Sequence, residues 1–198
     1  MKAIGITGEI GAGKSSCAGI LSRWGAKVID VDNLAKQVIA NNKKFLQAVK
    51  NAFAEELLDQ EGNLLTNKLK KIIEENPKVL DLISQYIHPE VVGLIKERLS
   101  FFENEGEHLV VIDAPLLIEV GIKKIVDFTI VVIADPHTRE KRLQKGKRIS
   151  IELYRILSDR QFKREEKMKH ADVIIDNSGD LMELEEKLKR VWEEIKEE

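Results

Sequence analysis

The chain has 198 residues, of which 43% are hydrophobic and 33% are charged, and its formal net charge is −2. This composition is typical of a folded globular protein, and without a basic excess it gives no support for a nucleic-acid partner. Cys17 is the single cysteine, which excludes an internal disulfide, and no apolar run approaches the roughly 20 residues that cross a bilayer, so we expect a cytoplasmic protein with no membrane partner.

Five short apolar runs predict buried parallel strands. They are rich in β-branched residues and bounded by glycine, proline or aspartate, and their continuous hydrophobicity indicates burial on both faces. In chain order they are Ala3–Thr7, the weaker run Lys27–Asp30, Leu109–Asp113, Thr129–Ile133 and Val173–Asp176. Helical patterns alternate with them, over Lys14–Trp24, Pro136–Lys145 and the amphipathic Leu181–Lys196. Strands that alternate with helices predict a three-layer α/β fold with a parallel sheet.

The stretch from residue 42 to residue 107 lacks a strand pattern. It predicts several helices, with breaks at Asp59–Asn63 and Asn76–Pro77. We expect a single domain over residues 1–198, with a core of about 1–41 and 108–198 and a helical insertion of about 42–107. A second, highly charged helical stretch, Ser150–His170, separates the fourth and fifth predicted strands.

Residues Gly8–Ser15 match the phosphate-binding motif (P-loop) G-x-x-x-x-G-K-[ST] in full. The motif follows a predicted strand and opens a predicted helix, which is the context that it requires. Its glycines let the backbone turn tightly, so that N–H groups and the helix N-terminus face phosphate oxygens. Lys14 is expected to reach the β- and γ-phosphates of ATP, and the Ser15 hydroxyl to bind Mg²⁺. The predicted ATP site comprises Gly8, Gly11, Ala12, Gly13, Lys14, Ser15 and Ser16.

A nucleotide site alone does not identify the reaction. A GTP switch protein carries an Asn-Lys-x-Asp segment after a late strand, whereas here the strand ends continue as Ala134-Asp135-Pro136 and Asn177-Ser178-Gly179. A small-molecule kinase instead needs an acceptor site and a mobile basic lid that excludes water. The helical insertion and the basic stretch Arg139–Lys169 suit these tasks, so we expect a lid over about residues 140–170.

Further motifs, in a fixed order along nearly the whole chain, resemble one family. They are Ile4–Gly8, Val28–Asp32 followed by Ala35, Ile87-His88-Pro89, Asp113–Glu119, Arg142-Leu143, Gln161, Lys167, Ala171-Asp172 and Asp176–Gly179. The P-loop alone is shared by many unrelated enzymes, but the ordered set is far more specific. By these motifs the chain closely resembles the dephospho-coenzyme A kinases, which catalyse the last step of coenzyme A synthesis.

The resemblance implies ATP and Mg²⁺ as cosubstrates and the ribose 3′-hydroxyl of dephospho-coenzyme A as acceptor. It also implies the fold of the nucleoside monophosphate kinases, with a five-stranded parallel sheet, a helical acceptor region and a lid. Asp32 would activate the acceptor hydroxyl, and Arg142 would bind phosphates from the lid. Asn177 and Gly179 would line the adenine pocket. Together with Lys14, Asp32 and Arg142 form the expected catalytic set.

The chain departs from the family pattern at two positions. Members usually have glycine where this chain has Glu9, and because a carboxylate repels phosphate we expect its side chain to point away. The lid usually carries a second arginine four residues after the first. Here that position is Gly146, and the neighbouring Lys145, Lys147 and Arg148 are the candidates to replace it.

The carboxylates at the strand ends have alternative interpretations. Asp32 follows the second predicted strand, at the edge of the sheet where ligands bind, but aspartate is also a favoured N-cap and can begin a helix over Asn33–Ile39. Asp30, placed on the same strand face, is the second candidate base. Asp113 ends the third predicted strand and can hold Mg²⁺ or cap the turn into Pro115.

The expected acceptor contacts, besides Asp32, are His88, Pro115 and Leu116. The dipeptide His88-Pro89 can instead simply open a helix, with proline in its first turn. Glu119 either assists the acceptor site or is a solvated carboxylate.

The sequence predicts direct in-line phosphoryl transfer to a small-molecule hydroxyl. Two alternatives remain open at this stage. One is a kinase of the same architecture with another small acceptor, and the other is a regulatory or assembly protein that hydrolyses ATP without an acceptor.

Overall fold

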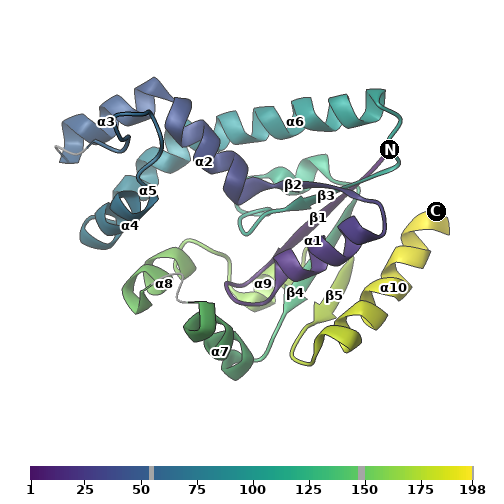
Figure 1. The fold of residues 1–198 in the computed structure, drawn as a ribbon. Coiled ribbons are helices and arrows are strands. Elements are labelled where there is room, and N and C mark those ends of the chain that lie inside the picture. Colours follow the sequence, from purple (N-terminus) through teal and green to yellow (C-terminus); the bar gives the residue numbers. More distant parts are fainter. Residues whose placement is uncertain (54–55, 147–149, 198) are drawn as a thin grey trace.

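A five-stranded sheet forms the middle layer of the computed structural model, which describes residues 1–53, 56–146 and 150–197 (Figure 1). The strands are β1 (Lys2–Gly8), β2 (Lys27–Asp30), β3 (Leu109–Asp113), β4 (Phe128–Ile133) and β5 (Val173–Asp176). They lie in the order β2-β3-β1-β4-β5, and all pairings between these strands are parallel. The predicted α/β class with a five-stranded parallel sheet is confirmed.

Helices fill most of the chain between the strands. They are α1 (Lys14–Arg23), α2 (Val31–Asn41), α3 (Lys43–Phe53), α4 (Thr66–Glu75), α5 (Val79–Leu82), the π-helical turn η1 (Ile83–Ile87), α6 (His88–Asn104), the 3₁₀ turn η2 (Ile122–Ile125), α7 (Pro136–Gly146), α8 (Ile151–Ser158), α9 (Arg164–Met168) and α10 (Leu181–Glu197). Over the residues that the structure describes, none of them combines the length and the apolar character that a membrane span requires.

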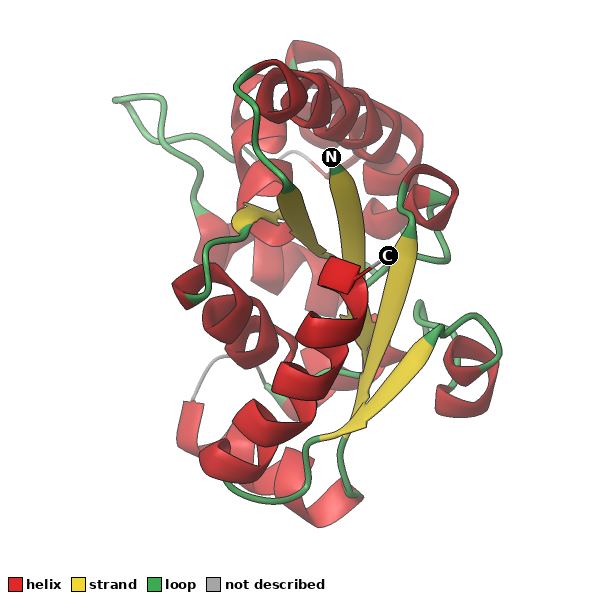
Figure 2. Ribbon diagram, turned by 90° about the vertical axis from the view of Figure 1, so that its right-hand side faces the viewer, coloured by secondary structure: helices red, strands yellow, loops and turns green. Residues whose placement is uncertain are grey.

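The strands are buried on both faces, as their continuous hydrophobicity predicts. On one face, Ile4 and Ile6 of β1 belong to a hydrophobic cluster with Ile20 of α1 and Leu188 of α10. On the other face, Ile112 of β3 belongs to a second cluster, to which α2 and α6 contribute. Helices therefore cover both sides of the sheet, in three layers (Figure 2).

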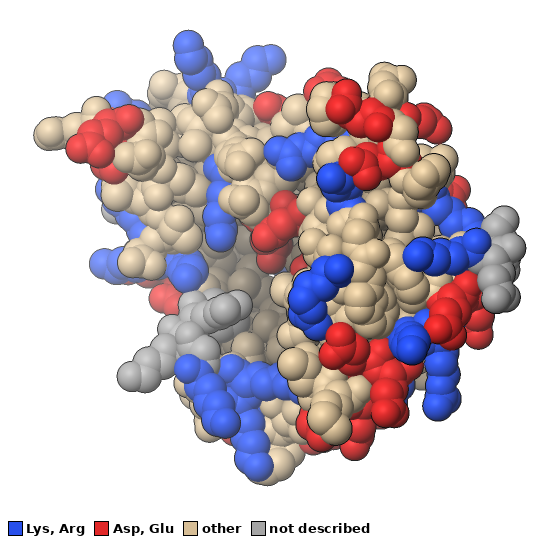
Figure 3. Space-filling view, turned by 45° about the vertical axis from the view of Figure 1, so that its right-hand side comes forward, with Lys and Arg blue, Asp and Glu red and all other residues tan. Residues whose placement is uncertain are grey.

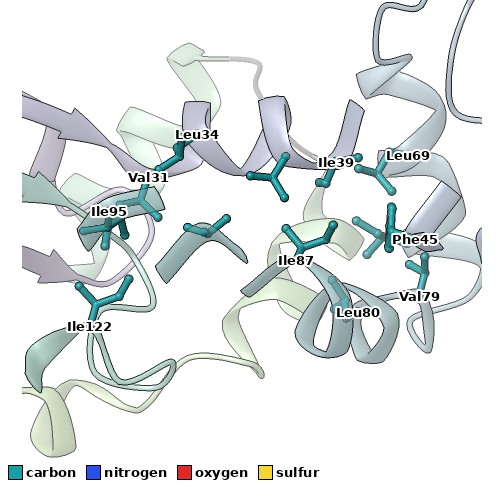
Figure 4. Close-up of a cluster of buried hydrophobic side chains, with 14 of the residues drawn as sticks. Val31, Leu34, Ile39, Phe45, Leu69, Val79, Leu80, Ile87, Ile95 and Ile122 are labelled. Carbon is teal, nitrogen blue, oxygen red and sulfur yellow. The ribbon is translucent and has the colours of Figure 1, made fainter. Parts of the chain in front are cut away.

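The second cluster extends far from the sheet. Val31, Leu34, Ile95 and Ile122 lie at its sheet end, and it continues through Phe45, Leu69, Val79, Leu80 and Ile87 of the helical stretch (Figure 4). This stretch has no strand among its described residues, and its one β-bridge pairs Leu58 with Leu64. Because one cluster of buried apolar side chains runs from the sheet into the helices α3, α4, α5 and α6, the hydrophobic effect holds these helices against the rest of the domain.

The path of the chain determines where ligands bind. From β1 it continues to β2 and β3 on one side of the sheet and then crosses to β4 and β5 on the other. In parallel sheets, ligand crevices open at the carboxyl ends of the strands where the direction changes in this way. The loop after β1 and the ends of β2 and β3 meet at this edge, which brings together the segments 8–16, 30–32 and 113–116.

Candidate active site

The loop between β1 and α1 follows a path that requires glycine near its two ends. Gly8 has a φ of 151°, and a Cβ there would collide with the Val132 carbonyl of β4. Gly13 has a φ of 94°, and a Cβ would collide with the Asn177 side-chain amide. L-amino acids with a side chain rarely adopt such φ values, so both the backbone and its neighbours select glycine.

The N-terminus of α1 is left open towards the loop. Gly13 occupies its N-cap position and offers no side-chain hydrogen bond, and the first turn holds no acidic residue. The Ala12 amide donates a hydrogen bond to the Glu9 carbonyl oxygen at 3.1 Å. This bond holds the loop in a turn next to the N-terminus of α1. Uncapped amides and the positive end of the helix dipole make an anion-binding site.

Lys14 folds back over the loop. Its Nζ donates to the carbonyl oxygens of Gly8 at 3.2 Å and Glu9 at 3.3 Å. Burial lowers the pKa of Lys14, while the carboxylates of Asp113 and Asp32 oppose this and favour the charged form. The ammonium group is therefore held at the loop, where it can meet phosphate oxygens.

Ser15 and Asp113 form the pair that can hold a metal ion. The Ser15 hydroxyl donates to Oδ2 of Asp113 at 2.8 Å, and Asp113 is 8% exposed. Burial raises the pKa of Asp113, which the hydrogen bond from Ser15 and the Lys14 charge oppose. No cluster of three or more His, Cys, Asp or Glu side chains occurs in the described ranges. Two hard oxygen donors beside a phosphate loop suit Mg²⁺, which takes few protein ligands and is completed by phosphate and water.

Asp32 lies in the first turn of α2, because the helix starts directly after β2 with no loop between them. The alternative of Asp32 as an N-cap is wrong: the cap is Asp30, whose side chain accepts from the Asn33 amide at 2.9 Å. The two aspartates accordingly do not share a strand face. Asp32 is exposed, but its surroundings remove part of its hydration and thereby raise its pKa; the nearby Lys14 charge lowers the pKa, and Asp30 raises it further.

Most of these groups line one cavity of about 1560 Å³, whereas Gly8, Ala12 and Asp113 are not part of its lining. Its walls include the loop residues Gly11, Gly13, Lys14, Ser15 and Ser16, and also Asp32, His88, Pro115, Leu116 and Arg142. A pocket for one ligand usually measures about 300–1,000 Å³, so this cavity has room for two substrates. Figure 3 shows a deep hollow with Lys and Arg side chains along much of its rim.

His88 lines the cavity and also begins α6, with Pro89 in the first turn, so its two interpretations are compatible. Burial lowers the pKa of His88. The side chain therefore favours its neutral form, which can both donate and accept a hydrogen bond.

Arg142 of α7 reaches the cavity from the lid segment. Its NH1 lies 3.4 Å from the Ala12 carbonyl oxygen, and its NH2 lies 3.5 Å from Oδ1 of Asn177. Both contacts are long and therefore weak. Lys145 lines the same cavity, whereas the candidates Lys147 and Arg148 fall outside the described residues.

Asn177 and Gly179 do not line the large cavity. Asn177 is 4% exposed and donates from Nδ2 to the Ala12 carbonyl at 2.8 Å, so it supports the loop from behind. Gly179 is exposed and lies against the carboxylate of Glu183. Their contact with adenine stays a prediction.

No particular role was predicted for Lys167, yet this residue is fully buried beside the site. Its Nζ contacts Oε1 of Glu119 at 2.7 Å, the Pro115 carbonyl at 2.8 Å and the Thr7 hydroxyl at 3.3 Å. The side chain of Glu119 is 9% exposed, so the solvated alternative is wrong, and Glu119 also accepts from the Phe162 amide at 2.7 Å. The pair joins the end of β1 to the loop after β3 and to the segment between α8 and α9.

Lys167→Met is expected to lower the free energy of unfolding by about 3–5 kcal/mol, because it leaves the Glu119 carboxylate buried without a counter-charge. Urea unfolding at neutral pH measures the loss. Lys169→Met, which removes an exposed lysine paired with Glu166, is the control and should change little. The double change Lys167→Met with Glu119→Gln should recover part of the loss. Equal losses in the single and double variants would exclude the unpaired carboxylate as the cause.

Comparisons with known proteins agree with this geometry. The family model described as dephospho-CoA kinase matches residues 2–183. A dephospho-CoA kinase of Fusobacterium nucleatum is 36% identical over 192 residues, which cover 97% of each chain. Two solved structures also match almost throughout. A Thermus thermophilus protein, TT1252, has 34% identity and a TM-score of 0.74, with 98% of this chain and 97% of that chain covered. A dephospho-CoA kinase of Campylobacter jejuni has 26% identity and a TM-score of 0.72, with 98% of both chains covered.

The family model spans nearly the whole chain, and the Fusobacterium nucleatum relative is 36% identical over 97% of it. The phosphate-binding motif and the large cavity that it lines agree with this match. The chain belongs to the dephospho-CoA kinase family.

Proposed function

We propose that this chain transfers the γ-phosphoryl group of ATP to the ribose 3′-hydroxyl of dephospho-CoA, giving CoA and ADP. The observation that carries the proposal is that Lys14 and Asp32 line one continuous cavity, with an anion site at α1 and an extended acceptor region beside it. One cavity with both groups allows direct transfer between two bound substrates, without a phosphorylated enzyme.

In this reaction the acceptor oxygen attacks the γ-phosphorus as the bond from that phosphorus to the oxygen of ADP breaks. Asp32 orients the hydroxyl and takes its proton. Lys14, the loop amides and Arg142 bind the phosphate oxygens, on which the negative charge of the transition state is spread. Ser15 and Asp113 would hold Mg²⁺, which supplies further charge neutralisation at the phosphates.

The acceptor region lies between the helical insertion and the lid segment. The insertion contributes Leu80, Ile83, His88 and Val92, and the lid segment contributes Leu143, Leu157, Arg160 and Gln161. Polar side-chain contacts between described residues join these parts, Arg160 to Asp81 at 2.8 Å and Ser150 to Glu74, and Leu153 of α8 belongs to the hydrophobic cluster of the insertion. We assign residues 42–107 to acceptor binding and residues 140–170 to the lid, within one domain. The cytoplasmic location expected from the sequence stays a prediction.

An assay of ADP release tests the proposal. Dephospho-CoA should stimulate release strongly, and adenosine, AMP and other nucleoside monophosphates should do so weakly or not at all. A preference for a nucleoside monophosphate would show a kinase with a different acceptor. Release of ADP that no acceptor stimulates would show an ATPase. Chelation by EDTA should stop turnover, and added Mg²⁺ should restore it.

Arg142→Ala is expected to lower kcat by roughly 10²-fold while raising the Kd of ATP much less, because a loosely held arginine gains its contacts as charge develops in transfer. Steady-state kinetics and ATP titration measure the two effects. Lys145→Ala, on the same helix, serves as the control and should matter less. A silent Arg142→Ala together with a crippled Lys145→Ala would show that the catalytic cation of the lid is misassigned.

A further inference from the structure

Glu9 places a carboxylate in a loop that binds phosphates. Its side chain is 20% exposed and does not line the cavity, in agreement with the expectation that it points away. It forms an ion pair with Arg139 of α7, while its other oxygen, Oε2, is buried and has no hydrogen-bond partner among the described residues. Among the described residues, Arg139 is the cation in direct contact with the Glu9 carboxylate, and the buried Lys167 ammonium interacts with the same charge without an ion pair.

Arg139 is held from three directions and is 14% exposed. Its NH1 contacts the Glu9 carboxylate, its Nε donates to the Ile10 carbonyl at 3.2 Å, and its NH2 donates to the Tyr154 hydroxyl of α8 at 2.8 Å. A planar guanidinium with all three nitrogens engaged has one orientation. Among the described residues, Arg142, one turn later on α7, makes two long contacts, which hold its guanidinium less firmly than that of Arg139.

We propose that Arg139 is a positioning residue whose charge neutralises Glu9 and thereby makes the phosphate-binding loop fit for ATP. The inference rests on the proposed use of this loop for ATP, but it concerns a pair outside the transfer chemistry. Without Arg139, the Glu9 carboxylate repels the triphosphate. The hydrogen bond from Arg139 to the Tyr154 hydroxyl also connects α7 to α8.

The Kd of ATP, measured by isothermal titration calorimetry on the full chain without acceptor, tests this inference. Arg139→Gln should raise the Kd by roughly tenfold or more, as expected when one member of a coupled charge pair is removed. Glu9→Gln should bind ATP as tightly as the parent or more tightly. The double variant should bind within about threefold of Glu9→Gln, because no uncompensated carboxylate remains. Arg139→Lys, which keeps the charge, should stay within about threefold of the parent.

The comparison between Arg139→Gln and the double variant isolates the charge, because both lose the contacts to Ile10 and Tyr154. Lys141→Gln is the matched control, since it removes one positive charge from an exposed position of the same helix and should leave the Kd unchanged. Thermal unfolding of each variant separates loss of fold from loss of affinity.

Three results would overturn the inference. One is an Arg139→Gln variant that binds ATP as the parent does. Another is a double variant as weak as Arg139→Gln, which would mean that Arg139 contacts the nucleotide itself or holds the loop by shape. The third is Arg139→Lys binding as weakly as Arg139→Gln. A parent that fails to bind ATP would instead contradict the proposed function.

Discussion

Lys14→Ala is expected to lower phosphoryl transfer by at least roughly 10³-fold, since a preorganised charge at the transferring group is lost. The fold should persist, because within the described ranges the hydrogen bonds of the Lys14 ammonium go to two carbonyls of its own loop. ADP release with dephospho-CoA measures the loss, and circular dichroism with thermal unfolding measures the fold. Lys44→Ala, at an exposed position of α3, is the control. A Lys14→Ala enzyme with near-normal turnover would contradict the assignment of the loop.

Asp32→Asn is expected to cut kcat by roughly 10²–10⁴-fold, the range for a positioned base, because asparagine keeps the size but cannot take a proton. A loose transition state keeps the acceptor proton until late, which favours the lower half of that range. Thermal stability should hardly change, since Asp30 and not Asp32 caps α2. The Kd of ATP should also stay near that of the parent, because the phosphates are bound elsewhere.

Asp30→Asn is the matched control for this variant. Asparagine caps helices as well as aspartate does, and the Asp30 side chain is already engaged by the Asn33 amide, so turnover should stay within about threefold. The pH dependence adds a second test. The raised pKa of Asp32 predicts that parent activity falls with acidification at a pH above the ordinary range of an aspartate, and that Asp32→Asn loses this acid limb. If Asp32→Asn turned over like the parent while Asp30→Asn did not, Asp30 would be the base.

The strands could be predicted because a buried parallel strand must be apolar on both faces. Leu109–Asp113 and Val173–Asp176 match β3 and β5 residue for residue. The phosphate loop could be predicted for a related reason, since its glycines and its lysine are each required by local geometry or charge. Both signals lie within a few consecutive residues.

Other parts of the site could not be read from local patterns. The cap of α2 was misplaced because β2 runs straight into the helix, which leaves no loop residue to mark the boundary. Lys167 was missed as a buried residue because a lysine in a charged stretch normally indicates a solvated helix face. The pairing of Glu9 with Arg139 depends on tertiary structure that joins residues far apart in the sequence.

The position of β1 in the sheet has a consequence for how the protein is made. Lys2 pairs with Leu109 and Ile4 pairs with Phe128, so both neighbours of β1 are synthesised long after it. Until they emerge, a nascent chain carries an apolar strand with two open edges, a state prone to aggregation and suited to chaperone binding. The conformation of the phosphate-binding loop also depends on Asn177, whose side-chain amide donates a hydrogen bond to the Ala12 carbonyl. The phosphate-binding loop consequently reaches its native form only after Asn177, 165 residues beyond Ala12, has been synthesised.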